Sequence, residues 1–236
     1  MSFRFKRFTV QDDRCAMKVG TDGVLLGAWC PVKVERGMNR FLDVGTGSGL
    51  IALMLAQRCE TAAIDAIDID AEAVCQAAEN FAQSPWAGRL SVQQISLQEF
   101  VKNRVGQYDL VVSNPPYFVN SLKNPDALRQ AARHTDTLSY SDLVACAAQL
   151  LREDGVLALI LPAEAEAVLA DEAAKAGLFP FRVTHVYSKP GNPVKRVLAA
   201  FRKGEHGECE KDVLYIESEK TPRSDEYAEL TWEFYL

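Results

Sequence analysis

The residues Phe41-Leu42-Asp43-Val44-Gly45-Thr46-Gly47-Ser48-Gly49 join a short apolar run to a loop with three alternating glycines. After this loop, Leu50 to Arg58 carries apolar residues at helical spacing. A strand, a glycine loop and a helix therefore follow one another. In parallel sheets ligands bind at this carboxyl end of a strand, and alternate glycines let a ligand approach the backbone closely. A turn needed only for tight packing is the alternative.

The same alternation continues along the chain, and it predicts an α/β fold. A parallel sheet covered by helices on both faces follows, because most crossovers are long enough for a helix. The last two strands are joined only by a turn, so the final strand is expected to run antiparallel in a seven-stranded sheet. The expected strands are 41–44, 62–69, 90–95, 107–112, 156–161, 180–187 and 194–201, and the expected helices are 50–58, 71–83, 142–151 (closed by Gly155) and 163–176.

No repeat, low-complexity tract or boundary divides the 236 residues, so we expect one domain over 1–236. An N-terminal extension (1–38) is expected to hold a short strand or hairpin, a loop and a helix from about Asp22. The catalytic core would span 39–203. A more polar appendix (204–236) would carry Asp212 to Ile216 as an edge strand.

Composition excludes several functional classes. A net charge of −6 argues against non-specific coating of nucleic acid. The six cysteines form no C-x-x-C pair and the three histidines lie far apart, so neither a disulfide framework nor a metal site is indicated. The start has no apolar segment behind its charges and no run reaches membrane-spanning length. We expect a cytoplasmic protein, without membrane contact, that is a monomer or a weak oligomer.

A second informative stretch is Ser113-Asn114-Pro115-Pro116-Tyr117, which follows the apolar run 108–112. Two consecutive prolines make this turn stiff and leave its carbonyls outside a ladder. The Asn114 amide and a proline carbonyl can accept hydrogen bonds from an exocyclic amino group, while Tyr117 stacks on a flat ring. The alternative is ordinary turn punctuation, with Tyr117 covering the edge of a core.

Between these stretches, Ile67-Asp68-Ile69-Asp70 ends a strand roughly 20 residues past the glycine loop, where a carboxylate can accept hydrogen bonds from both hydroxyls of a ribose. Asp70 opens the next helix, either as its N-cap or as a ligand contact.

The spacing of Asp43 and the three glycines resembles the first motif of the class I S-adenosylmethionine-dependent methyltransferases. Together with Asp68 and Asn-Pro-Pro-Tyr, it resembles their amino-methyltransferase branch, over Phe41 to Leu161. The resemblance implies that S-adenosyl-L-methionine is bound and that Asn114, Pro115, Pro116 and Tyr117 hold the amine to be methylated. Asp68 would bind the ribose, Ile69 would pack on the adenine, and Ser96 would take the place of an acid near the adenine amino group. The implied donor site also includes Asp43, Gly45, Thr46, Gly47, Gly49 and Asn114.

The segments before Phe41 and after Leu161 indicate a more specific family. Phe8-Thr9-Val10, the run Met17 to Trp29 and the segments around Lys189-Pro190 and Lys195 to Leu198 closely resemble the bacterial tRNA1(Val) adenine N6-methyltransferases. This implies methylation of N6 of the adenosine directly 3′ of the anticodon of tRNA(Val). The segment Gly20 to Gly23 would then help to close the donor pocket, and Lys18, Gly20 and Thr21 would contact the donor. Basic residues at both ends would contact the tRNA backbone: Arg4, Lys6, Arg7, Lys189, Lys195 and Arg196.

Residues Phe118 to Thr137 form a long connection after the turn, of the kind that often serves as a lid. Arg129 and Arg133 in it either hold phosphates beside an adenosine turned out of its stack or belong to a solvated helix face.

Other substrates stay open. A release-factor glutamine methyltransferase shares Asn-Pro-Pro-Tyr, but it usually has a helical domain before the glycine loop, and a DNA adenine methyltransferase needs a recognition domain for which there is no room. An rRNA enzyme acting on guanine N2 or adenine N6 remains, although the guanine enzymes more often have Phe in place of Tyr117. The non-enzymatic alternative is an RNA-binding module on a methyltransferase scaffold.

Overall fold

The computed structural model describes residues 2–32, 39–116, 138–204 and 207–236. Within them, eight strands form a central sheet in the order β10-β8-β9-β7-β6-β3-β4-β5. Neighbouring strands are parallel except where β9 pairs with β7 and β8. The strands are β3 (Arg40–Val44), β4 (Ala63–Asp68), β5 (Leu90–Gln94), β6 (Tyr108–Ser113), β7 (Leu151–Pro162), β8 (Leu178–Tyr187), β9 (Val194–Lys203) and β10 (Glu210–Tyr215).

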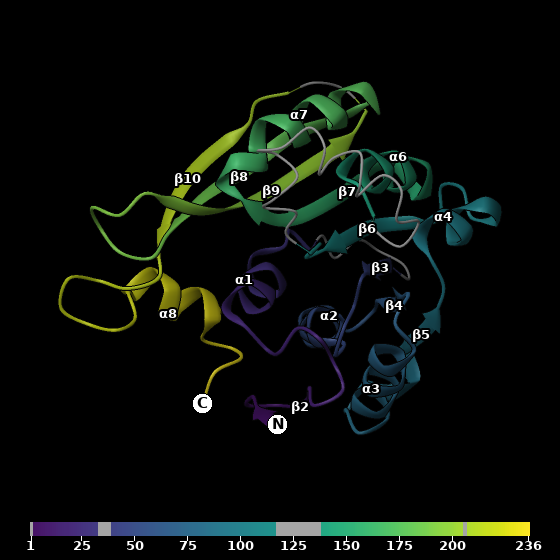
Figure 1. Ribbon diagram of the computed structural model, residues 1–236, viewed down its shortest axis with the longest axis horizontal. Helices are drawn as coiled ribbons and strands as arrows, with labels where there is room; N and C mark the ends of the chain where they lie inside the picture. Colours follow the sequence, from purple (N-terminus) through teal and green to yellow (C-terminus); the bar gives the residue numbers. More distant parts are fainter. Residues whose placement is uncertain (1, 33–38, 117–137, 205–206) are drawn as a thin grey trace.

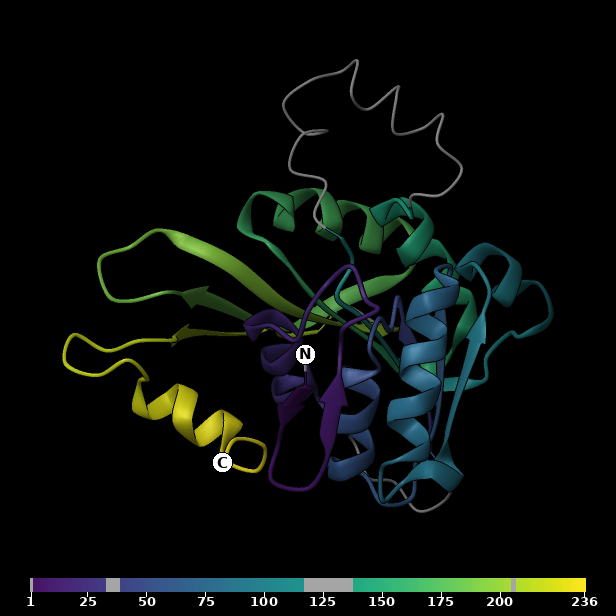
Figure 2. The same cartoon turned by 60° about the horizontal axis from the view of Figure 1, so that its bottom comes forward.

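Helices cover both faces of this sheet, as the alternating pattern predicted. Figure 1 and Figure 2 show α1, α2 and α3 on one face and α6 and α7 on the other. The helices are α1 (Thr21–Trp29), α2 (Leu50–Arg58), α3 (Ala71–Ala82), α4 (Leu97–Phe100), α6 (Tyr140–Leu150), α7 (Glu166–Lys175) and α8 (Asp225–Thr231), with single 3-10 turns at Ala87–Arg89, Val101–Asn103 and Ala163–Ala165.

Two apolar layers form the core, one on each face of the sheet. Residues 157–161 of β7 are all fully buried, and they alternate between the two layers. A continuous apolar run is what a parallel strand with both faces covered requires. The predicted antiparallel final strand of the core is confirmed as β9, which pairs along its length with β7 and β8.

Helices α1 and α2 approach each other closely at Gly27. A Cβ atom at this position would stand 2.6 Å from the Met54 sulfur of α2. This packing ties α1 to the helix that follows the glycine loop.

The start of β7 differs from the prediction. The strand was expected from residue 156, but it begins at Leu151, directly after α6. Asp154 has φ of 60°, and a Cβ on Gly155 would lie 2.9 Å from the Arg152 carbonyl oxygen. Gly155 therefore permits a tight irregularity inside the strand and does not close the helix before it.

The chain ends are part of the same body. The predicted edge strand is confirmed as β10, and it pairs with β8 and adds an eighth strand beyond the β8–β9 hairpin. Helix α8 contacts α1, and β1 (Ser2–Arg4) and β2 (Thr9–Gln11) form an antiparallel N-terminal hairpin. Phe5 of this hairpin stacks on Tyr235. Among the described residues, no helix is both long and apolar enough to cross a membrane.

Register places the predicted site residues at one edge. Val44 is opposite both Ile67 of β4 and Ser113 of β6, so these three strands end level with one another. The glycine loop, Asp68 and Asn114 therefore emerge side by side at the carboxyl edge.

Candidate functional site

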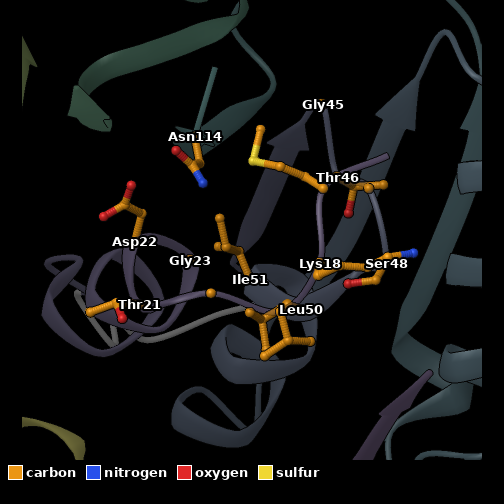
Figure 3. Close-up of a pocket in the computed structure, with 14 residues that line it drawn as sticks. Lys18, Thr21, Asp22, Gly23, Gly45, Thr46, Ser48, Leu50, Ile51 and Asn114 are labelled. Carbon is orange, nitrogen blue, oxygen red and sulfur yellow. The ribbon is translucent and has the colours of Figure 1, made fainter. Parts of the chain in front are cut away.

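A pocket of about 400 Å³ opens at the carboxyl edge, between the glycine loop and the first turn of α1. Figure 3 shows Asn114 from the end of β6 and Asp22 from α1 on one side of this pocket, with Thr46 of the glycine loop on the other. The lining residues are Met17, Lys18, Val19, Gly20, Thr21, Asp22, Gly23, Gly45, Thr46, Gly47, Ser48, Leu50, Ile51 and Asn114.

The glycine loop needs its glycines for two different reasons. Gly45 and Gly47 have φ of 69° and 54°, and a Cβ on either would meet no atom within 4 Å. Gly49 has φ of 80°, and a Cβ there would lie 2.4 Å from the Phe81 ring. The first two glycines leave open space above the backbone, whereas the third lets α3 pack against the loop.

Asp43 lies beneath the loop and is fully buried. Its Oδ2 accepts hydrogen bonds from the Thr46 hydroxyl at 2.7 Å and from the Ala52 amide at 3.2 Å, while Oδ1 has no hydrogen-bond partner among the described residues. Burial raises the pKa of the Asp43 carboxyl to about 7. Through its hydrogen bond with the Thr46 hydroxyl, Asp43 thus holds in place a loop residue that lines the pocket.

Asp68 ends β4 beside the loop. Its two carboxylate oxygens accept hydrogen bonds from the amides of Gly47, at 2.9 Å, and Asp70, at 3.0 Å. Ile69, the next residue, is an exposed apolar side chain, 53% accessible. A carboxylate and an apolar surface therefore stand next to the open backbone of the loop.

Two neighbouring polar residues act as helix caps. Asp70 accepts from the Glu72 amide at the start of α3, which supports the N-cap interpretation. Ser96 is the N-cap of α4, and its hydroxyl accepts from the Glu99 amide at 3.3 Å.

The N-terminal extension forms the opposite wall. Lys18, which was predicted to contact the donor, lines the pocket. Its ammonium donates to the carbonyls of Asp12 (2.7 Å), Cys15 (2.9 Å) and Asp13 (3.1 Å). Lys18 therefore folds its own loop, which leads to Gly20 and Thr21 at the N-terminus of α1.

Asn114 reaches the pocket from the end of β6. The preceding Ser113 is buried and donates from its hydroxyl to the Val44 carbonyl at 2.8 Å, so the two strand ends are fixed to each other. Pro115 is buried and Pro116 is exposed. Tyr117, Arg129 and Arg133 lie outside the described residues.

The predicted basic contacts fall in two places. Lys6 lies over the Trp232 ring and Arg7 over Trp86, which comes between α3 and β5 at the amino edge of the sheet, opposite the pocket. Arg4 is exposed on β1 of the same hairpin.

Lys189 and Lys195 are exposed at the turn between β8 and β9, on the same edge as the pocket. Arg196 makes an ion pair at 3.0 Å with Asp22, which lines the pocket.

Sequence reasoning missed several residues of the site. Leu50 and Ile51 line the pocket, and Asn80 of α3 donates a hydrogen bond to the Ser48 carbonyl of the glycine loop. Position could have indicated Ile51, because it lies in the first turn of the helix after the loop. No local signal indicates Asn80, because its partners come from two distant segments.

Comparison with known proteins agrees with this geometry. The methyltransferase small domain family matches residues 31–171. The tRNA1(Val) (adenine(37)-N6)-methyltransferase of Parabacteroides distasonis is 51% identical over 234 residues, which cover 99% of this chain and 97% of that protein. The protein of the same name from Yersinia enterocolitica is 43% identical, with 99% and 92% covered.

Solved structures extend the likeness to the fold. A predicted O-methyltransferase from Agrobacterium tumefaciens superposes with a TM-score of 0.72 at 17% identity, covering 90% of this chain and 96% of that one. The predicted class I methyltransferase fold is confirmed. With its nearly full-length relatives, the chain belongs to the family of tRNA1(Val) (adenine(37)-N6)-methyltransferases, built on the methyltransferase small domain.

Proposed function

We propose that this protein transfers a methyl group from S-adenosyl-L-methionine to N6 of the adenosine directly 3′ of the anticodon in tRNA(Val). The observation that carries the proposal is Asn114 on the wall of a pocket that also contains the open glycine loop. The full-length relatives carry this activity in their names.

The donor fits the residues that are present. The backbone at Gly45 and Gly47 has open space where a Cβ would be, so a ligand can lie directly against it. Asp68 offers carboxylate oxygens to ribose hydroxyls, and exposed Ile69 offers an apolar surface to an adenine ring. Ser96 can still accept a hydrogen bond, because a hydroxyl oxygen has two lone pairs.

Three further parts of the chain complete this donor site. Asp43 and Thr46 hold the loop, and Gly49 lets α3 support it. Gly20 and Thr21 close the methionine side, on a loop folded by Lys18. When bound, the donor supplies an electrophilic methyl group on a sulfonium.

The acceptor chemistry is mainly orientation. The Asn114 amide oxygen and the Pro115 carbonyl accept the two N–H bonds of the adenine amino group, so that its lone pair faces the donor. Pro116 stiffens the turn, and Tyr117 stacks on the base. A strong base is not needed if the proton leaves after methyl transfer.

The tRNA must approach along the carboxyl edge, because the pocket opens there. Lys189 and Lys195 are exposed on this edge and can contact phosphates next to the target. Arg4, Lys6 and Arg7 lie on the hairpin at the other end, so they would touch a distant part of the tRNA. Arg129 and Arg133 stay predictions for the phosphates beside the adenosine. A tRNA substrate also supports the predicted cytoplasmic location.

The test is methyl transfer from labelled S-adenosylmethionine to tRNA that lacks this modification, followed by nucleoside analysis. We expect N6-methyladenosine in the valine fraction. Label in rRNA or in a release factor, and none in tRNA, would contradict the substrate and keep the chemistry. A protein that binds the donor and transfers to nothing would point to an RNA-binding role.

A further inference from the structure

Asn80 of α3 holds together two segments that are distant in sequence. Its side chain is 1% exposed. The amide nitrogen donates to the carbonyls of Ser48 and Gln11, both at 2.8 Å, and the amide oxygen accepts from the Gln11 amide at 3.0 Å. These three hydrogen bonds connect the buried side chain to the glycine loop and to strand β2.

Residues of α3 near Asn80 also contact the glycine loop and the N-terminal segment. The adjacent Phe81 packs on Gly49, where a Cβ would not fit. One turn before Asn80, Gln76 accepts from the Arg14 amide at 3.4 Å. Glu79, directly before Asn80, makes an ion pair with the Arg14 guanidinium at 3.0 Å. One face of α3 therefore carries the glycine loop and residues 11–14 together.

A short chain of contacts leads from Gln11 to the pocket. The next residue, Asp12, is buried, and its carboxylate accepts from the Val19 amide at 2.9 Å. Its carbonyl accepts from the Lys18 ammonium. Val19 and Lys18 line the pocket, so the position of Gln11 fixes the position of the N-terminal wall.

We propose that Asn80 is a positioning residue for the methyl donor, because it sets the separation between the two walls of the pocket. One wall is the glycine loop, reached through Ser48, and the other is the segment 17–23, reached through Gln11. This inference rests on the proposed function, since it takes the pocket to be the donor site. Asn80 itself is not among the residues that line the pocket.

The experiment compares two variants of Asn80 with a matched control. Asn80→Ala removes all three hydrogen bonds, and Asn80→Asp keeps the acceptor for Gln11 but cannot donate to either carbonyl. The control is Gln57→Ala, because Gln57 of α2 is also a buried amide that holds a distant backbone carbonyl, that of Glu233, at 2.9 Å. That contact is outside the pocket lining.

The readouts are the Kd for S-adenosylhomocysteine by calorimetry, the thermal midpoint, and the KM and kcat of methyl transfer. For both Asn80 variants we expect the Kd to rise by about tenfold, with the KM for tRNA and the kcat at saturating donor changed by less than about threefold. Gln57→Ala should lower the midpoint while its Kd stays within about twofold of wild type.

Three outcomes would overturn the proposal: Asn80 variants that bind S-adenosylhomocysteine like wild type, a Gln57 variant that loses affinity equally, or failure of both Asn80 variants to fold. The last would show that the side chain serves the whole fold. A wild-type protein that binds S-adenosylhomocysteine without methylating tRNA would refute the proposed function alone, because the comparison of Kd values does not use the tRNA.

Discussion

Asn114 is the residue whose removal separates binding from chemistry. It lies on the pocket wall, at the end of a strand fixed to its neighbour by Ser113. Asn114→Ala should lower kcat by about 10²-fold or more, because orientation of the amine is lost, while the Kd for the donor changes little. Single-turnover transfer and calorimetry measure the two quantities. A variant that loses donor affinity and keeps its rate would show that the roles are wrongly assigned.

Asp68 should behave in the opposite way. Its carboxylate holds the Gly47 amide and is available to a ribose. Asp68→Ala should weaken donor binding by about 10-fold to 100-fold, with a smaller change in kcat at saturating donor. The assay is the KM for S-adenosylmethionine with tRNA in excess. An unchanged KM would remove Asp68 from the donor site.

Asp43 predicts a dependence of stability on pH. Its carboxyl has a pKa of about 7 in the folded protein, above the ordinary value of 3.8, because burial disfavours the charged form. Between these values the folded state binds more protons than the unfolded state, so this group lowers stability as the pH rises from about 4 to 7, by at most about 1.4 kcal/mol per pH unit.

The variant Asp43→Asn has no such titration. Urea denaturation at pH 5, 6, 7 and 8 should therefore show that wild type loses stability relative to the variant as the pH rises, and that the difference levels off above about 7. A constant difference from pH 5 to 8 would refute the raised pKa.

At the level of elements, the contact between α1 and α2 positions the N-terminal wall of the pocket. Gly27→Ala would bring a Cβ to 2.6 Å from the sulfur of fully buried Met54. Overpacking costs about 1–3 kcal/mol, which exceeds the gain of about 1 kcal/mol in helix propensity. We expect a net loss of stability of about 1 kcal/mol by chemical denaturation.

Gly88→Ala is the matched control, because nothing lies within 4 Å of its added Cβ. It should stay within about 0.5 kcal/mol of wild type. Equal losses in the two variants would mean that backbone flexibility, and not the helix contact, decides the effect.

The elements predicted from sequence are those whose signals are local. The glycine loop, the strand before it and the acid at the end of β4 lie within short stretches, and register then brings them to one edge. Asn114 was found for the same reason, since the two prolines mark the turn next to it. The paired strands β8 and β9 were expected because only a turn joins them.

Contacts between distant segments were not predictable in this way. The ion pair of Arg196 with Asp22, which is far away in sequence, had no signal in the sequence, and the predicted contact of Arg196 with RNA stays a prediction. Gly155 was read as a helix end, although the backbone it permits is inside a strand.

For the whole molecule, the distribution of positive charge on the surface decides where this protein, with a net charge of −6, can bind tRNA. The pocket edge carries Lys189 and Lys195, both exposed. Reversal of both charges should weaken tRNA binding and make it less dependent on salt, by a slope of up to about 2, because phosphate contacts release counterions. Arg196 is left unchanged, since its reversal would also disturb the pocket through Asp22.

The control for this experiment is Lys175→Glu. Lys175 ends α7 and is 69% exposed. Because α7 runs back from the carboxyl end of β7, its end lies at the opposite edge of the sheet. Filter binding between low and moderate salt should separate the two variants. The double variant changes the net charge by −4 and the control by −2, so a loss of binding free energy in the control that is half that of the double variant would show that net charge, and not this edge, governs binding.

The most direct test of the account uses two unmodified tRNA(Val) transcripts that differ at one base, the adenosine 3′ of the anticodon or a guanosine in its place. With labelled S-adenosylmethionine, we predict that the wild-type protein labels only the first transcript, and that nucleoside analysis recovers the label as N6-methyladenosine. Label in both transcripts, or label in the first as any other nucleoside, would contradict the proposed function.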